Sequence, residues 1–149
     1  MELRRAGLAD LPLLVPLFDG YRGFYRQPSD PGLAERFLRE RLERDESVIY
    51  LACVEGSAAG FVQLYPSFWS IAARRSWILN DLFVAPAFRG RGIGRVLLER
   101  ARAHAEATGY GGLSLATERT NTTAQRLYEA QGWKRDELYF HYELELPSA

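Results

Sequence analysis

The sequence is short of cysteine, of net charge and of long hydrophobic runs, and each shortage excludes a class of protein. Cys53 is the single cysteine, so no disulfide framework can hold the chain together. The 19 basic and 19 acidic residues cancel, which gives no reason to expect nucleic acid or an anionic membrane as a partner. The N-terminal residues lead into no long apolar stretch, so we expect no signal peptide, no membrane span and a cytoplasmic protein.

The length of 149 residues suits one domain with a buried core and is too short for two. We therefore expect a single domain over residues 1–149. Neither His104 nor His141 has a cysteine or carboxylate at metal-ligand spacing, so no metal site is predicted. A Gly-x-Ser-x-Gly turn is missing as well, which disfavours a serine hydrolase.

Glycine and arginine alternate in one short run, between β-forming residues 79–84 and a helical repeat. The run reads Arg89-Gly90-Arg91-Gly92-Ile93-Gly94-Arg95. Glycine allows a sharp turn and a close approach of another molecule to the backbone. The free N–H groups and the positive dipole end of the following helix attract an anion, and arginine pairs well with phosphate oxygens. These features predict a pyrophosphate site.

Two common phosphate-binding motifs do not fit this run. The dinucleotide fingerprint requires a last glycine, and Leu97 stands in its place. The P-loop requires a lysine after its glycines, and the run contains none. Arg-x-x-Gly-x-Gly directly after a strand is the pattern that remains.

Periodicity and turn residues predict the element order β-α-α-β-β-β-α-β-α-β. We expect strands at residues 1–6, 47–55, 58–65, 76–84, 113–116 and 138–146, and helices at 10–25, 92–108, 121–130 and from Pro31 onward. Pro16 is expected to kink or break the first helix. Residues 66–73 are expected to form a loop that carries Phe68 and Trp69. The last strand has the clearest alternation of apolar and polar residues in the chain.

A second pattern lies near the C-terminus and reads Asn121-Thr122-Thr123-Ala124-Gln125-Arg126-Leu127-Tyr128-Glu129-Ala130-Gln131-Gly132-Trp133. Helical spacing places Asn121, Ala124 and Tyr128 on one face. The two motifs and the element order together resemble the GNAT superfamily of acetyl-CoA-dependent N-acetyltransferases over nearly the whole chain. Residues 21–28 and 138–142 look similar to a branch with histone- and polyamine-acetylating members.

The resemblance implies an α/β (α+β) fold in which about four helices flank a mixed sheet of six to seven strands. It implies acetyl-CoA as the cofactor, with its pantetheine arm on the backbone of Leu82, Phe83 and Val84 and its pyrophosphate on the loop from Arg89 to Arg95. Asn121 and Ala124 would face the pantetheine, and Tyr128 would donate a proton to the departing sulfur. A phenol with a pKa near 10 suits a thiolate whose acid has a pKa of about 8.5.

The general base is less clearly indicated. Polyamine-acetylating relatives often carry Glu-Asp where this chain has Asn80-Asp81, and an amide cannot take a proton. Asp81 remains a candidate, although strand alternation predicts that its side chain lies on the face opposite Asn80. Asp81 acting through water, another group, or a chain of waters all stay open.

The acceptor site of such a fold would be lined by aromatic residues of the first helices, the loop after residue 65 and the late strands. These are Phe24, Tyr25, Phe68, Trp69 and Tyr139. Aromatic walls hold the alkyl stem of a cationic amine and attract its charge, although most of these residues could equally belong to the core. The acceptor is expected to be a primary amine, on a small molecule or on a lysine side chain.

Two further hypotheses concern activity and assembly. A CoA-binding sensor or partner module without transferase activity is the alternative to an enzyme, and the missing strand glutamate is the one feature in its favour. The long alternating C-terminal strand could add to the sheet of a second copy, so a homodimer is predicted.

Overall fold

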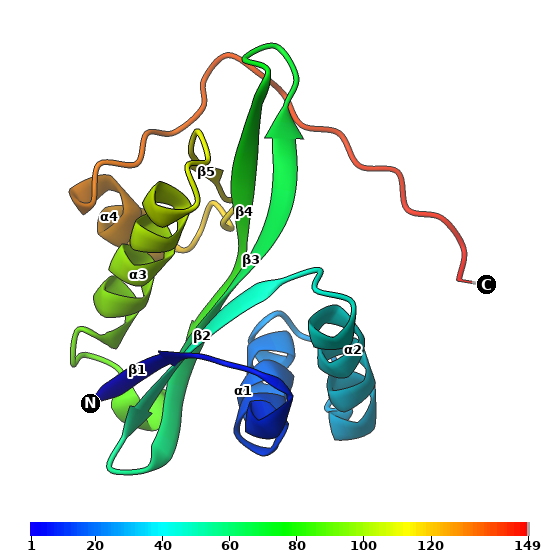
Figure 1. Cartoon of the computed structure of the whole chain (residues 1–149), viewed down its shortest axis with the longest axis vertical. Helices are drawn as coiled ribbons and strands as arrows, with labels where there is room; N and C mark the ends of the chain where they lie inside the picture. Colours follow the sequence, from blue (N-terminus) through cyan, green and yellow to red (C-terminus); the bar gives the residue numbers. More distant parts are fainter. Residues whose placement is uncertain (149) are drawn as a thin grey trace. The chain divides into compact units, whose positions relative to one another are not determined.

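The computed structural model describes residues 1–148, which form two compact units (Figure 1). The first unit spans Met1–Ala116, and the second begins at Thr117. The single domain expected from the chain length stays a prediction.

The first unit is a five-stranded mixed sheet with helices on both faces (Figure 1). Its strands follow in sequence order, β1 (Glu2–Arg5), β2 (Val48–Val54), β3 (Ser57–Trp69), β4 (Arg74–Val84) and β5 (Leu113–Ser114). The first four are antiparallel, and β5 runs parallel to β4. One face carries α1 (Leu11–Phe24) and α2 (Pro31–Glu43), and the other carries α3 (Ile93–Ala107). Short 3-10 turns lie at Leu8–Asp10 and Pro86–Phe88.

Local signals set the starts of the helices. The Asp30 side chain accepts a hydrogen bond from the Leu33 amide at 3.1 Å, and Pro31 is the first helical residue of α2, as predicted. Helix α1 continues through Pro16, so of the predicted kink or break the break is wrong and the kink stays a prediction. The face of α1 that packs on the sheet buries Leu14, Leu17 and Phe18. This packing stabilises the turn in which Pro16 donates no backbone hydrogen bond.

The β3–β4 hairpin is longer than predicted. Strand β3 reaches Trp69 and β4 begins at Arg74, so the loop shrinks to residues 70–73, and Phe68 and Trp69 lie in β3 rather than in a loop. Aromatic residues favour strands, and here each finds a surface to pack on. The Arg75 guanidinium lies 5.4 Å from the centre of the Phe68 ring. The Trp69 ring approaches Gly112 so closely that a Cβ there would lie 2.7 Å from it.

Strand β4 contains a bulge at Asn80. Gln63 of β3 lies opposite Asp81, and the next residue, Leu64, lies opposite Leu79, which leaves Asn80 as the extra residue. A bulge interrupts the strict alternation of side chains between the two faces of a sheet. The geometry around Asp81 follows from this irregularity.

The predicted last strand is wrong. No residue after Ser114 is assigned to a strand within the described part of the chain, so the sheet has five strands instead of six to seven and the order ends at α4 (Thr122–Ala130). The apolar side chains of residues 138–146 are 73–91% exposed, apart from Tyr139 at 67%. Alternation shows which side chains would share a face, but a strand also needs a neighbour for its backbone groups, and none of β1 to β5 pairs with this segment.

Glycine at position 60 is required by the close approach of β3 to β4. A Cβ at Gly60 would lie 2.7 Å from the Phe83 carbonyl oxygen and 3.3 Å from a Leu97 methyl carbon. We expect Gly60→Ala to lower the free energy of unfolding by about 1–3 kcal/mol in a urea titration, because the backbone must shift. Gly7→Ala is the control, since a Cβ there meets nothing within 4 Å. Equal stability of the two variants would contradict this packing.

Helices long and apolar enough to cross a membrane are not found among residues 1–148.

Candidate active site

The loop before α3 presents unpaired backbone donors. Gly90 and Gly92 have φ angles of 77° and 78°, in the left-handed region that glycine adopts without strain. The first hydrogen bond of α3 runs from the Val96 amide to the Gly92 carbonyl at 3.2 Å, and no side chain caps the helix. The N–H groups of residues 93–95 therefore lack partners within the helix and suit an anion.

The three arginines predicted to bind phosphate all border this loop, and each already contacts a neighbour. Arg89 donates from Nε to the Val84 carbonyl at 3.0 Å, and its guanidinium lies 5.6 Å from the centre of the Phe83 ring. The Arg91 guanidinium lies over Phe88, and Arg95 lies 3.9 Å from Glu99. Arg89 thus also ties the loop to the end of β4.

One edge of β4 is open beside this loop. Strand β4 pairs with β5 at two positions only, Trp77 and Ile78, in the described residues. Toward its end β4 pairs with β3 alone among residues 1–148, and Phe83 lies opposite Phe61. Backbone groups of successive residues point to alternate edges of a strand, and the Val84 carbonyl points to Arg89. Leu82 therefore shares the open edge with Val84, whereas the Phe83 backbone faces β3.

Asp81 is the centre of a buried polar cluster on the α1 side of the sheet. Its side chain is 1% exposed and accepts hydrogen bonds from Gln63 Nε2 at 2.5 Å and Asn80 Nδ2 at 2.9 Å. The Tyr21 hydroxyl of α1 donates to the Asn80 backbone carbonyl at 3.1 Å and lies close enough to the Asp81 carboxyl to lower its pKa. The prediction that Asn80 and Asp81 point to opposite faces is wrong, because the bulge lets the two side chains meet.

Burial changes the acidity of this cluster. Desolvation raises the pKa of Asp81, and the hydrogen bonds from Asn80, Gln63 and Tyr21 oppose the rise without cancelling it. Desolvation and the nearby Asp81 carboxylate raise the pKa of the Tyr21 phenol and of the Tyr65 phenol. Both phenols are therefore protonated at neutral pH, and Asp81 is the group in the cluster that can accept a further proton.

The predicted acceptor residues fall into separate places. Tyr25 packs edge-on against Tyr21 and Phe24, with ring centres 5.3 Å and 5.1 Å away, so Phe24 and Tyr25 adjoin the Asp81 cluster. Phe68 and Trp69 lie at the other end of the β3–β4 hairpin, where they pair with Arg75 and Arg74. Of the four predicted acceptor residues in the first unit, only Phe24 and Tyr25 therefore lie beside the Asp81 cluster.

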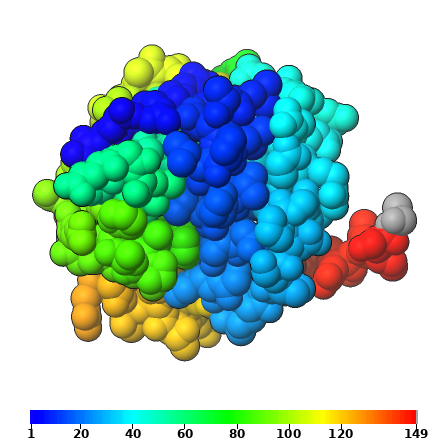
Figure 2. Space-filling view, turned by 90° about the horizontal axis from the view of Figure 1, so that it is seen from below, coloured from blue at the N-terminus to red at the C-terminus, as the bar shows by residue number. Residues whose placement is uncertain are grey.

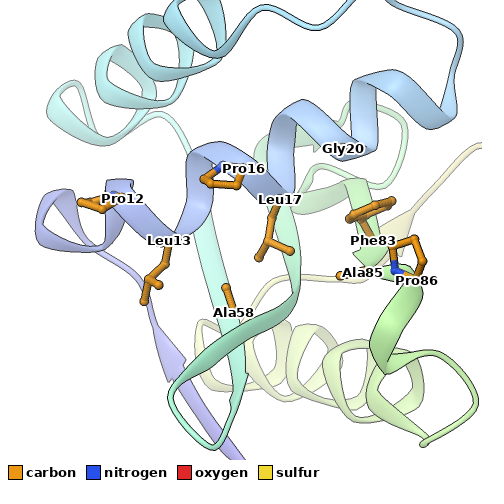
Figure 3. Close-up of a pocket in the computed structure, with 9 residues that line it drawn as sticks. All are labelled: Pro12, Leu13, Pro16, Leu17, Gly20, Ala58, Phe83, Ala85 and Pro86. Carbon is orange, nitrogen blue, oxygen red and sulfur yellow. The ribbon is translucent and has the colours of Figure 1, made fainter.

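An apolar hollow of about 290 Å³ lies between α1 and the ends of β3 and β4 (Figure 3). Its lining residues are Pro12, Leu13, Pro16, Leu17, Gly20, Ala58, Phe83, Ala85 and Pro86. Seen from below, α1 occupies the middle of this end of the first unit, beside α2 and the β2–β3 turn (Figure 2). The lining carries no charged side chain, so a cationic amine would lose its hydration there without compensation. The polar groups lie beyond Phe83, whose ring centre is 6.2 Å from that of Tyr21.

The second unit carries the Asn121–Trp133 motif on α4. The Asn121 side chain accepts a hydrogen bond from the Ala124 amide at 3.2 Å and caps the helix. Tyr128 follows on the same face and is half-buried, with its ring centre 6.0 Å from that of Trp133. Tyr139 lies in the exposed segment after the helix.

Sequence reasoning missed Gln63 and the position of Tyr21 in this cluster. Gln63 is fully buried in β3, and its Oε1 atom has no hydrogen-bond partner, although the Nε2 atom binds Asp81. A polar residue within the apolar run from Ala59 to Leu64 is the signal that marks such a position. No group of three or more histidine, cysteine or acidic residues in residues 1–148 is arranged to hold a metal ion.

Removing the charge of Asp81 is expected to stabilise the protein at neutral pH. A carboxyl whose pKa is raised by burial favours folding in its neutral form, and this contribution is lost as the pH rises through the folded-state pKa. We expect the Tm of Asp81→Asn to exceed that of the wild type at pH 8 and the difference to shrink toward pH 4. The Gln63 amide can turn over so that its unpaired Oε1 accepts from the new Asn side chain. A lower Tm for the variant at pH 8 would contradict this account.

Comparison with known proteins places this geometry in a family. The sequence profile described as the acetyltransferase (GNAT) family matches residues 14–133. An uncharacterized N-acetyltransferase of Bacillus subtilis, YhfO, is 46% identical over 148 residues, which cover 99% of each chain.

Two solved structures share the fold. The crystal structure of a probable acetyltransferase, 40% identical, superposes with a TM-score of 0.92 and covers all of both chains. An aminoglycoside N-acetyltransferase in complex with CoA superposes with a TM-score of 0.80 over 97% of this chain and 95% of the other. Its identity is 20%, so that likeness concerns the fold alone.

Proposed function

The chain belongs to the GNAT family of acetyltransferases, and from this we propose that it moves an acetyl group from acetyl-CoA to a primary amine. The amine belongs to a small molecule or to a lysine side chain, and it attacks the thioester directly while both substrates are bound. The observation that carries the proposal is the row of unpaired N–H groups at the start of α3, next to the open edge of β4.

The CoA site follows from these two features. The pyrophosphate is held by the backbone of residues 92–95 and the flanking arginines, because helix N-termini favour anions. The pantetheine arm runs along the edge of β4 at Leu82 and Val84, where backbone groups are not taken by β5. The resemblance assigns Asn121 and Ala124 of α4 to the same arm. A protein of the same fold has been solved with CoA bound, which supports the choice of cofactor.

The reaction has one bond made and one bond broken. The amine nitrogen attacks the thioester carbonyl carbon, and the carbon–sulfur bond breaks after the tetrahedral intermediate has formed. The amine must lose a proton, and we assign Asp81 as the base that takes it. The CoA sulfur must gain a proton, and we assign the Tyr128 hydroxyl as the acid that gives it. Asp81 is almost fully buried, so it acts through another group rather than by contact with the amine.

A primary amine is the acceptor class that fits the α1 end of the sheet. Tyr25 and Phe24 offer aromatic faces to a cation, and the buried Asp81 carboxylate lies behind them, beyond Tyr21. The resemblance to histone- and polyamine-acetylating members points to the same class. Asn80, which stands where that branch often has glutamate, holds the Asp81 carboxylate instead of taking a proton itself.

Thiol release from acetyl-CoA tests this proposal. We would measure it with spermidine, small diamines, aminoglycosides, amino acids and a lysine peptide, each against a blank without amine. Turnover above the blank with at least one class is expected. Tight CoA binding with no turnover on any amine would contradict the proposal and favour a CoA-binding module without transferase activity.

The homodimer is proposed on separate grounds. Leu138, Phe140, Tyr142, Leu144 and Leu146 alternate with polar residues and are 73–91% exposed. A second copy of this chain is the partner that would cover them, because its sheet offers a free strand edge at β5. Size-exclusion chromatography with light scattering should return twice the mass of one chain, and the mass of one chain would contradict the dimer.

A further inference from the structure

We propose that Tyr21 is the proton relay between the acceptor amine and Asp81, and that Gln63 positions Asp81 for this task. The inference rests on the proposed acetyl transfer and assigns the path by which the amine loses its proton. It starts from a conflict in the structure. The carboxyl that can take the proton is 1% exposed and lies beneath α1, where a substrate amine cannot touch it.

Of the three residues that act on the Asp81 carboxyl, only Tyr21 can pass a proton on. Gln63 and Asn80 contribute amide N–H groups, which donate a hydrogen bond but do not give up their protons near neutral pH. The Tyr21 hydroxyl both donates and accepts, and its one proton is donated to the Asn80 carbonyl in this structure. When the O–H turns from this carbonyl to Asp81, it can release the proton to the carboxylate while the oxygen takes one from the amine. After the transfer Asp81 is a neutral acid, Tyr21 is again a phenol, and the amine has lost one proton.

The position of Tyr21 supports this role. It stands near the C-terminal end of α1, is half-buried, and its hydroxyl reaches the bulge at Asn80, where it donates to the backbone carbonyl at 3.1 Å. Its ring is wedged between Phe61 and Phe83 on the sheet side and Tyr25 on the outer side, with centres 5.3–6.2 Å away. The ring contacts and this hydrogen bond therefore hold the hydroxyl at the bulge that carries Asn80 and Asp81.

Gln63 has no other evident reason to be buried in β3. It lies directly opposite Asp81 in the β3–β4 ladder and donates to Oδ2 at 2.5 Å, while its own Oε1 atom has no partner. A buried amide with an unsatisfied oxygen costs stability. The interaction orients the carboxyl so that its other oxygen faces Asn80 and the hydroxyl side of the cluster.

The charged and titratable groups around the relay are few. Tyr65 of β3 lies on the same face. The Asp81 carboxylate raises the pKa of the Tyr65 phenol, and Arg41 of α2 lowers it. Tyr25, at the end of α1, contributes to the raised pKa of the Tyr21 phenol. Burial raises the pKa of Asp81 and so brings the carboxyl toward the pH at which a base both holds and releases a proton efficiently.

The test compares the pH profiles of Tyr21→Phe, Tyr65→Phe and the wild type, with the amine that the wild type acetylates fastest. Tyr21→Phe should lower kcat about 100-fold at pH 7, the size of a general acid–base contribution, with KM for acetyl-CoA within about twofold. The acidic limb of the wild-type profile, assigned to Asp81, should be lost. Tyr65→Phe removes the neighbouring phenol that does not hydrogen-bond to Asp81, and its profile should match the wild type.

A second acceptor separates a relay from a packing effect. An amine of low basicity is already neutral at pH 7 and needs less help from a base, so the deficit of Tyr21→Phe should shrink at least tenfold with trifluoroethylamine, a weakly basic amine. Gln63→Leu should lower kcat and shift the acidic limb, because the carboxyl loses the donor that orients it. A wild-type profile in Gln63→Leu would remove Gln63 from the inference.

The outcomes distinguish this inference from the proposed function. An equal deficit of Tyr21→Phe at every pH and with both amines would overturn the relay while leaving acetyl transfer in place. A wild-type protein that acetylates none of the amines would contradict the proposed function, and the relay with it. Circular dichroism and Tm of each variant exclude unfolding as the cause, because phenylalanine keeps the ring that packs among the aromatic residues of α1 and the sheet.

Discussion

Tyr128→Phe is expected to lower kcat for acetyl transfer by about 10²- to 10³-fold, since general acid catalysis contributes factors of this size. The substitution removes one hydroxyl and keeps the ring that packs near Trp133, so the fold of α4 should be unchanged. The lost hydroxyl is the group assigned to protonate the CoA sulfur as the carbon–sulfur bond breaks. Binding of acetyl-CoA, measured by calorimetry, should stay within about twofold.

Tyr142→Phe is the matched control for this experiment. It removes a phenol from the same unit at an exposed position, and we expect no change in kcat. Unchanged kcat in Tyr128→Phe would remove Tyr128 from the reaction. A large rise in Kd for acetyl-CoA with normal kcat would instead make it a binding residue.

Gly92→Asp is expected to raise the Kd for acetyl-CoA by about 10²- to 10³-fold, or roughly 3–4 kcal/mol. The reason is charge and position together. Gly92 precedes the first residue of α3, with a φ of 78°, and the unpaired N–H groups assigned to the pyrophosphate follow it directly. A carboxylate there would occupy the donors from within the chain and repel the phosphates.

Backbone strain must be separated from charge in this experiment. Gly56→Asp supplies the control, because Gly56 lies in the β2–β3 turn with a φ of 79°, and a Cβ added there would meet no atom within 4 Å. The two variants should lose similar amounts of Tm, and only Gly92→Asp should lose affinity for acetyl-CoA. Equal affinity of both variants would contradict a phosphate site at the start of α3.

The phosphate loop could be predicted from the sequence because its structure depends on neighbours in the chain. Gly90 and Gly92 adopt the left-handed conformation that only glycine tolerates well, and the helix begins at Ile93, one residue after the predicted start. The same holds for the caps at Asp30 and Asn121, where one side chain binds an amide three residues on. Such short-range signals need no knowledge of the rest of the fold.

The Asp81 cluster could not be predicted because it depends on two strands and a helix at once. The bulge at Asn80 arises in the register between β3 and β4, and neither strand shows it alone. Strict alternation therefore placed Asp81 on the wrong side relative to Asn80. Gln63 and Tyr21 meet Asp81 from positions 18 and 60 residues away.

The prediction for the C-terminal segment is wrong for a different reason. Residues 138–146 have the pattern of a strand, and the structure leaves them unpaired. A period of two reports which side chains would face a core, but pairing depends on whether another strand edge is available. The pattern and the exposure together are the reason for proposing a second copy as the partner.

The fate of the acetyl group is the most direct test of the central claim. The protein would be incubated with acetyl-CoA labelled in the acetyl group and with the amine that turns over fastest, and the label located by mass spectrometry. We expect one labelled amide for each thiol released, with no label left on the protein. Label on the protein, or labelled acetate in place of the amide, would contradict direct transfer from acetyl-CoA to the amine.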